Sequence, residues 1–253
     1  MRLTQYFTSP RTEQALNRYS AVVPPTWSVA HRLDLYRSAK TAFDSDAPEA
    51  AKRESFRHIY ESLRSGWQVF RPKDSAECWG SEQIYAVLTN ECQPCARQSS
   101  LTLATLTERE SQANIEQCLR SLGRMKPTKH YPAVYPWMAV AKFSHFFNPR
   151  LFPIYDTAFM WEKVANGAFK TDYVEFCRRR GFQPREDTAR FNLQYTLWAA
   201  ETIRDADEGC MTTFAEWFAS QVKGHRDTGD ILADIKTYYA AAFEMIAIGA
   251  AHL

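Results

Sequence analysis

Glycine is scarce in this sequence, at 9 of 253 residues, against a usual share of about 7%. The chain contains neither a G-x-G-x-x-G nor a G-x-x-x-x-G-K-[ST] pattern. These glycines are what let a backbone wrap closely around phosphates. We therefore expect neither a Rossmann-type nor a P-loop nucleotide site.

Long apolar runs are also missing. The most apolar stretch, Tyr238 to Ala251, is interrupted by Glu244 and is shorter than the roughly 20 residues that a membrane-spanning helix needs. The opening residues, MRLTQYFTSPRTEQ, show no apolar core behind a basic segment, so no secretory signal is expected. We predict a cytoplasmic protein with no membrane partner.

A strong charge imbalance is lacking as well. The 31 basic and 29 acidic residues leave a net charge of +2, so a nucleic-acid site would have to be a local basic patch. Apolar residues make up 45% and charged residues 24%, which excludes a disordered chain. We expect one folded globule, and a monomer.

Cysteine offers no disulfide framework. Six cysteines are scattered along the chain, and a chain of this size needs no cross-links to fold, so we expect reduced thiols. Cys92 and Cys95 form one C-x-x-C pair, a spacing that is typical of one half of a zinc site or of a redox pair. No second pair follows at a suitable spacing, so we predict neither a metal nor another cofactor.

What the sequence does contain is helical spacing of apolar residues almost throughout. One stripe of apolar side chains lies between Pro48 and Gly66, and the pairs Thr107/Glu110 and Thr213/Glu216 fit the capping-box pattern at helix starts. A last helix is expected from about Thr228 to Ile248. About ten such helices and no period-two alternation predict an all-α fold, a single domain over 1–253 with two helical lobes and a cleft.

The most unusual segment runs from Tyr131 to Gly167. Its prolines predict a helix from Trp137 to Phe147, an extended proline-containing loop, and a second helix capped by Asp156. At that helix start, free N–H groups and the helix dipole favour an ionised carboxylate, so we expect a low pKa for Asp156. A fixed anion of this kind can stabilise a sugar oxocarbenium ion or orient a water molecule. The alternative is a simple helix cap, worth about 1 kcal/mol.

Lys142 and His145 are three residues apart and share one face of the helix before the loop. Lys142 could pair with a phosphate or act as an amine nucleophile, and His145 could donate to a phosphate or to a base edge. The alternatives are a solvated or salt-bridged lysine and a buried histidine with satisfied ring nitrogens.

The stretch FSHFFNPRLFPIYDTAFMW resembles the catalytic segment of base-excision DNA glycosylases of the helix-hairpin-helix superfamily, whose members carry patterns such as F-P-x-x-D. Here Phe152, Pro153 and Asp156 match. The resemblance implies a two-lobed, all-α hydrolase that flips a base out of DNA and cleaves its N-glycosidic bond, with Asp156 as the catalytic carboxylate and Lys142 and His145 lining the cleft.

Two departures from that family shape the prediction. The glycine-bearing hairpin that grips DNA is missing, since no glycine lies between Gly123 and Asp156. Lys142 also lies closer to Asp156 than the Schiff-base lysine of bifunctional members does, so we expect a monofunctional enzyme that leaves an abasic site. Atypical members without the hairpin include bacterial defence enzymes that remove glucosylated hydroxymethylcytosine from phage DNA. That base is our hypothesis for the substrate, beside a damaged base and a repair role.

A glycosylase also needs aromatic faces for the flipped base and cations for the phosphates. The aromatic candidates are Tyr155, Trp137, Trp161 and Tyr131, although most aromatics at helical spacing belong to a core. The phosphate-binding candidates are Arg150, Arg178, Arg179, Arg180 and Lys129, although arginines in a last helical turn also simply offset the helix dipole.

Two other classes of function stay open. The chain could be a non-catalytic helical module that binds nucleic acid or protein, in which Asp156 is only a cap. A metal-dependent nuclease is disfavoured, because no acidic and histidine cluster with metal-ligand spacing is evident.

Overall fold

The computed structural model describes residues 2–66, 79–106, 109–124, 136–184 and 189–253. Helices account for the secondary structure of these ranges, which include no strand, so the all-α prediction is confirmed. The helices are α1 (Ser9–Val22), α2 (Val29–Ala42), α3 (Glu49–Ser65), α4 (Ser81–Glu91), α5 (Arg109–Leu122), α6 (Trp137–Phe147), the π-helix η5 (Thr157–Ala168), α7 (Lys170–Arg180), α8 (Ala189–Arg204), α9 (Glu208–Gln221), α10 (Gly229–Asp234) and α11 (Tyr239–Ala250).

Short 3₁₀ turns connect several of these helices. They are η1 (Leu3–Tyr6), η2 (Pro25–Trp27), η4 (Gln93–Cys95) and η6 (Ile235–Thr237). Two of them have a proline in the first two positions, Pro25 in η2 and Pro94 in η4. A fixed φ near −65° suits the first turn of a helix.

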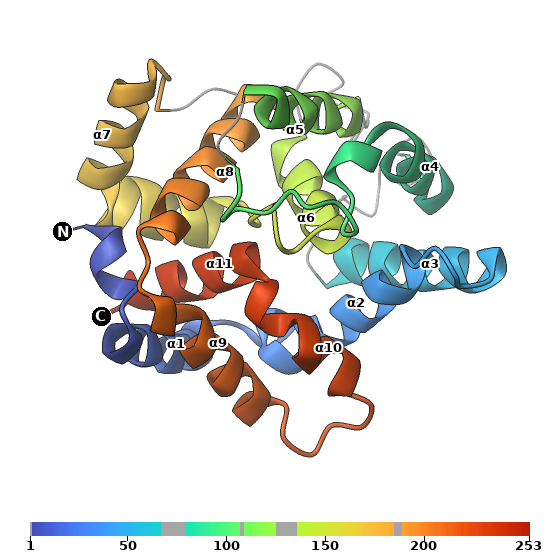
Figure 1. Cartoon of the computed structure of the whole chain (residues 1–253), viewed down its shortest axis with the longest axis horizontal. Coiled ribbons are helices and arrows are strands. Elements are labelled where there is room, and N and C mark those ends of the chain that lie inside the picture. Colours follow the sequence, from blue (N-terminus) through green and yellow to red (C-terminus); the bar gives the residue numbers. More distant parts are fainter. Residues whose placement is uncertain (1, 67–78, 107–108, 125–135, 185–188) are drawn as a thin grey trace.

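The core is organised around α11, which crosses the middle of the molecule (Figure 1). All of its residues from Ala240 to Ala250 are buried, and it packs against α1, α8, α9 and η5. A helix that is apolar on every side is stable only when other elements enclose it. Because α1 and α11 lie side by side, the N-terminal and C-terminal parts of the chain pack against each other.

The second inner helix is α6. Apart from the exposed Met138, its described side chains are buried, and it packs against α2, α5 and α8. Together α2, α6 and α11 surround the proline-containing loop that follows α6.

Two predicted helix boundaries are wrong. The helix expected from Thr228 to Ile248 is interrupted at Tyr238, where ψ is 60°, and the N–H of Ala240 donates to the carbonyl of Pro149 instead (3.1 Å). The helix expected to start at Thr213 starts at Glu208, after Asp207, which accepts the N–H of Ser9 from the neighbouring α1 (2.9 Å). In both cases a long-range contact sets the boundary. Thr107 lies outside the described residues.

The chain predicted as one globule has one continuous hydrophobic core, to which residues from Leu3 to Ala250 contribute. The division into two lobes with a cleft stays a prediction. Among the described residues, no helix combines the length and the apolar character needed to cross a bilayer.

Candidate functional site

The proline-containing loop ends in a helix cap, as predicted. Residues 152–156 have no regular secondary structure, and Asp156, which is extended (φ −142°, ψ 163°), precedes η5. Its Oδ1 accepts the backbone N–H of Phe159 at 2.8 Å. The carbonyl of Asp156 accepts from Trp161, five residues on (3.0 Å). This is the wide π-type turn, which is rare and recurs at functional sites.

His145 holds the loop at its start. Its Nδ1 lies 2.8 Å from the carbonyl of Phe152, and its Nε2 lies 2.9 Å from the hydroxyl of Tyr36 on α2. Because a carbonyl can only accept, Nδ1 donates, and Nε2 then accepts from Tyr36. Burial keeps the pKa of His145 well below its ordinary value. The side chain is fully buried, so it positions the loop and presents no nitrogen to a base edge or a phosphate.

Glu244 holds the same loop two residues further on. Its carboxylate accepts the backbone N–H of Ile154 and forms an ion pair with Arg32 of α2, and both side chains are completely buried. The pKa of Glu244 is raised, because burial outweighs the lowering effect of the Arg32 guanidinium. A buried pair of this kind contributes little net stability but fixes geometry when its bonds are satisfied. The loop is thus anchored from α6 and from α11 before it reaches Asp156.

Asp156 itself is 5% exposed. Its pKa is raised above the ordinary aspartate value because burial outweighs the N–H of Phe159 and the charge of Lys142, which both lower it. The sequence-based expectation of a low pKa is therefore wrong. The helix start acts on the carboxylate as predicted, but desolvation is the larger effect. Oδ2 is buried and has no hydrogen-bond partner in the structure.

Lys142 is buried like Asp156 and is close enough to it for the two charges to interact. Burial lowers its pKa from 10.5 to about 8, although the negative charges of Asp156 and Glu244 partly restore it. The structure thus brings together two of the candidate catalytic residues that the sequence singled out. A lysine with a pKa of about 8 is protonated at neutral pH and gives up its proton readily.

The predicted base-stacking residues fall in different environments. Tyr155 is buried, with its ring edge-on to Phe191 (4.8 Å) and Tyr195 (5.0 Å), so it belongs to the wall behind Asp156. Trp161 is partly buried and packs edge-on against Phe191. Tyr131 and the side chain of Trp137 lie outside the described residues.

The predicted phosphate-binding arginines divide into two groups. Arg178, Arg179 and Arg180 are exposed at the end of α7. Arg179 and Arg180 pair there with Glu201 of α8, and no ion pair of Arg178 is found within the described ranges. Arg150 is turned inward from the loop, and its Nη1 donates to the carbonyl of Arg97 (3.1 Å). Lys129 lies outside the described residues.

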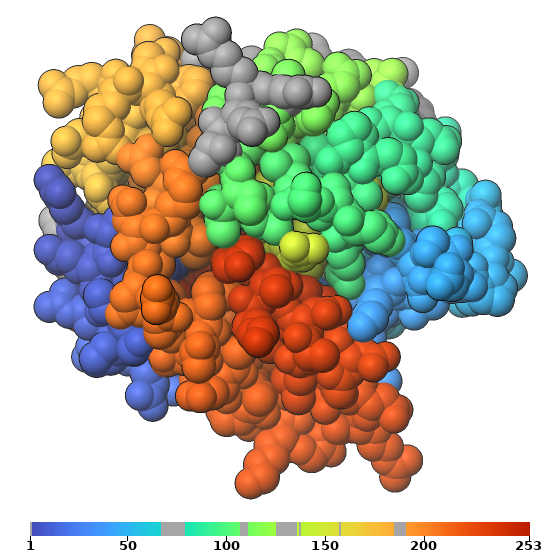
Figure 2. Space-filling model, in the orientation of Figure 1, coloured from blue at the N-terminus to red at the C-terminus, as the bar shows by residue number. Residues whose placement is uncertain are grey.

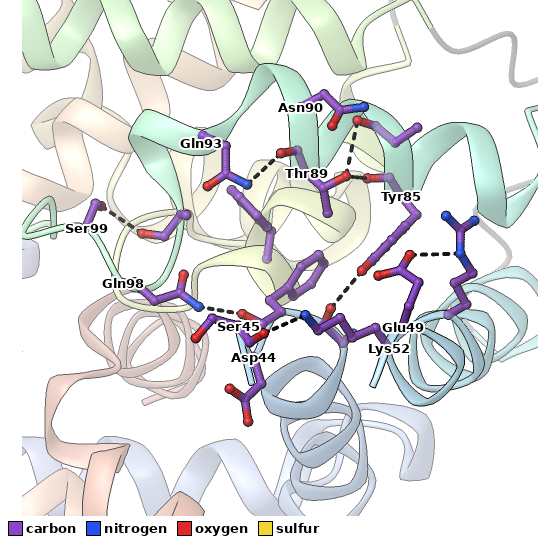
Figure 3. A pocket seen from close by; sticks show the side chains of 16 residues that line it. Asp44, Ser45, Glu49, Lys52, Tyr85, Thr89, Asn90, Gln93, Gln98 and Ser99 are labelled. Atoms are coloured by element: carbon purple, nitrogen blue, oxygen red, sulfur yellow. Dashed lines mark hydrogen bonds and ion pairs between the residues drawn. The ribbon is translucent and has the colours of Figure 1, made fainter. Parts of the chain in front are cut away.

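A cavity lies elsewhere among the described residues. It has a volume of about 730 Å³ and is lined by the end of α2, the start of α3, α4 and the segment after it (Figure 3). Its wall is a mixture of polar and apolar side chains, and Gln93 and Gln98 donate there to backbone carbonyls (both 2.5 Å). Asp156 and Lys142 do not line this cavity, so it is separate from the buried site.

Three of the thiols form a buried group. Cys92, Cys95 and Cys118 are reduced and buried together, and burial raises the pKa of Cys118 well above its ordinary value. Among the described residues, no set of three or more histidine, cysteine or acidic side chains has an arrangement that could hold a metal ion. Cys78 lies outside them.

Comparison with known proteins finds no matching family model, no matching curated protein and no matching solved structure.

Three residues that position the loop, Arg32, Tyr36 and Glu244, were not predicted from the sequence. The only signal was Glu244, a lone charge in an apolar run, because a charge inside a buried helix requires a partner.

Proposed function

We propose that the chain is a DNA glycosylase that hydrolyses the N-glycosidic bond of a modified or damaged base. The observation that carries this proposal is the buried pair of Asp156 and Lys142 at the end of a loop anchored by His145 and Glu244. It supplies an anion and a proton donor at one rigid position, and cleavage of a nucleoside needs both.

In the proposed reaction, the ammonium group of Lys142 donates its proton to the departing base while the C–N bond breaks and its electron pair leaves with the base. The sugar becomes an oxocarbenium ion, which the carboxylate of Asp156 stabilises. Water then adds to the sugar carbon, and its proton returns to Lys142. The products are the base and an abasic site, and no covalent intermediate with the lysine is required.

Asp156→Asn tests this role. Asparagine caps a helix about as well as aspartate does, so the variant keeps the bond to Phe159 and loses only the charge. We expect the folded variant to release base at least about a hundredfold more slowly. The matched control is Asp207→Asn, since Asp207 is the exposed residue before α9, and it should leave the rate unchanged.

The assay detects abasic sites in chelator, on duplexes with unmodified, alkylated and oxidised bases and with hydroxymethylcytosine with and without glucose. Product on one duplex, lost in Asp156→Asn alone, would establish the activity and name the base. Full activity of the variant would refute the role of Asp156.

A non-catalytic binding module is the second candidate. The near-complete burial of Asp156 and its capping bond favour it. It predicts DNA binding without a product on any duplex, and at most about 1 kcal/mol of stability lost in Asp156→Asn.

A further inference from the structure

Three segments meet around Arg97, namely the chain after η4, the turn after α6 and the residue just before α11. The carbonyl of Arg150 accepts the N–H of Leu103 (2.9 Å), and Nη1 of Arg150 donates to the carbonyl of Arg97 (3.1 Å). The Arg97 guanidinium lies over the ring of Tyr238, 5.5 Å from its centre. Two arginines and one tyrosine thus share one location, which we call the Arg97 cluster.

Five hydrogen-bonding atoms of the Arg97 cluster are unsatisfied. All three guanidinium nitrogens of Arg97, Nε of Arg150 and the hydroxyl of Tyr238 are buried and have no hydrogen-bond partner in the structure. The pKa of Tyr238 is raised, because burial outweighs the lowering effect of the positive charges of Arg97 and Arg150. The acidic residue that also acts on Tyr238, Asp234, is paired with Lys40 (3.3 Å).

Such an arrangement is costly unless something completes it. A buried guanidinium normally has a carboxylate or phosphate partner, because its desolvation is otherwise not offset. Arg32 shows the usual solution in this same protein, since Glu244 pairs with it. For Arg97 and Arg150, the described residues offer no such carboxylate. The unsatisfied groups can all donate, so they fit a ligand with several acceptor oxygens and negative charge.

The cluster is also close to the candidate site along the chain. Arg150 stands near the start of the loop that ends at Asp156, and six residues span at most about 20 Å. Chain near residue 150, yellow in Figure 2, reaches the surface between the segment around residue 100, in green, and the C-terminal part, in red. Arg97 and Arg150 are each partly exposed as residues, although the nitrogens named above are buried, so an anion reaches these nitrogens only when the arginine side chains move.

We propose that the Arg97 cluster binds a phosphate group, and that this phosphate belongs to the backbone of the DNA whose base is presented to Asp156. The second part rests on the proposed function. An arriving phosphate draws the Arg97 guanidinium from the ring of Tyr238 and accepts from Arg97, Arg150 and Tyr238. Arg150 was predicted from the sequence as a phosphate ligand, whereas Arg97 and Tyr238 are proposed as ligands only from the structure.

The melting temperature, measured with and without phosphate, distinguishes a phosphate-binding Arg97 from one that only stabilises the fold. The substitution Arg97→Met removes a buried charge without an anionic partner, so we expect its melting temperature without phosphate to equal or exceed that of the parent. Inorganic phosphate should raise the melting temperature of the parent protein and raise that of Arg97→Met much less. A variant that melts lower, with the same response to phosphate, would show that Arg97 is only structural.

Binding of a DNA duplex, measured by fluorescence anisotropy over a series of salt concentrations, identifies the source of the phosphate. For Arg97→Met we expect at least about tenfold weaker binding and a log–log salt slope smaller by about 0.9, the value for one lost phosphate contact. The control is Arg57→Met, which loses the same charge from the exposed face of α3. Unchanged DNA binding alongside a lost response to inorganic phosphate would assign the cluster to a free phosphate compound and overturn its assignment to DNA.

The two proposals fail separately. Abasic-site formation by the parent protein with Arg97→Met binding DNA as tightly as Arg57→Met would refute the Arg97 cluster alone. Weakened DNA binding by Arg97→Met, with no abasic site formed by the parent on any duplex, would refute the glycosylase and keep the cluster as a DNA contact.

Discussion

At the scale of single residues, Lys142 has the most testable electrostatics. Its pKa of about 8 in the folded protein is lowered by burial from 10.5. Between these two values the unfolded chain holds more protons than the folded protein, so this group makes the protein more stable as pH rises from 8 to 10.5. The difference corresponds to about 3 kcal/mol.

We therefore expect the free energy of unfolding of the parent protein, relative to that of Lys142→Met, to increase by about 3 kcal/mol between pH 7 and 10.5. The difference between the two proteins is the proper quantity, because buried tyrosines such as Tyr19 and Tyr36, whose pKa values burial raises, destabilise both at high pH. Urea unfolding at several pH values measures it. Parallel curves would mean that Lys142 titrates normally.

The residue scale also shows where sequence-based prediction stops. The cap at Asp156 was predictable because it depends on local backbone geometry, and the structure confirms it. The pKa of the same carboxyl was predicted in the wrong direction, because it depends on burial by distant helices. The Arg32–Glu244 pair joins residues 212 positions apart, and no local pattern reports such a partner.

At the scale of elements, the contact between α1 and α11 depends on one small residue. A Cβ placed on Gly249 would overlap the backbone carbonyl of Ala15. We expect Gly249→Ala to force the two helices apart and to lower the free energy of unfolding by about 1–3 kcal/mol, the usual cost of overpacking. Chemical denaturation measures the loss.

Gly229→Ala is the matched control for that substitution. It lies at the start of α10, and a Cβ there meets nothing within 4 Å. Alanine should be neutral or slightly stabilising at this position, since it forms helices better than glycine. Equal effects of the two substitutions would refute close packing of α1 on α11.

Helix interiors followed the sequence pattern, whereas some helix ends did not. The bounds of α6 were predicted correctly, because prolines flank that helix on both sides. The start of α11 depends on Pro149, whose carbonyl accepts the N–H of Ala240. Apolar periodicity continues through Tyr238 and gave no sign of that interruption.

At the scale of the whole molecule, the ends of the chain are tied into one core. The N–H of Leu3 donates to the carboxylate of Asp172 (2.9 Å), and Nε of Arg18 donates to the carbonyl of His252 (3.0 Å). Arg32 and Glu244 join α2 to α11 in the interior. Contacts between residues distant in sequence therefore also hold residues 152–156, which we call the site loop.

This arrangement predicts that the protein unfolds as one unit in urea, although chains longer than about 150 residues often unfold in steps. Tryptophan fluorescence and far-UV circular dichroism should give the same midpoint, since Trp27, Trp198 and Trp217 report from separate helices that share one core. Glu244→Gln should shift both midpoints together, because Glu244 links α2, the site loop and α11. Two separate midpoints, only one of which moves in Glu244→Gln, would instead reveal the two lobes predicted from the sequence and place the site loop in the lobe that unfolds with α11.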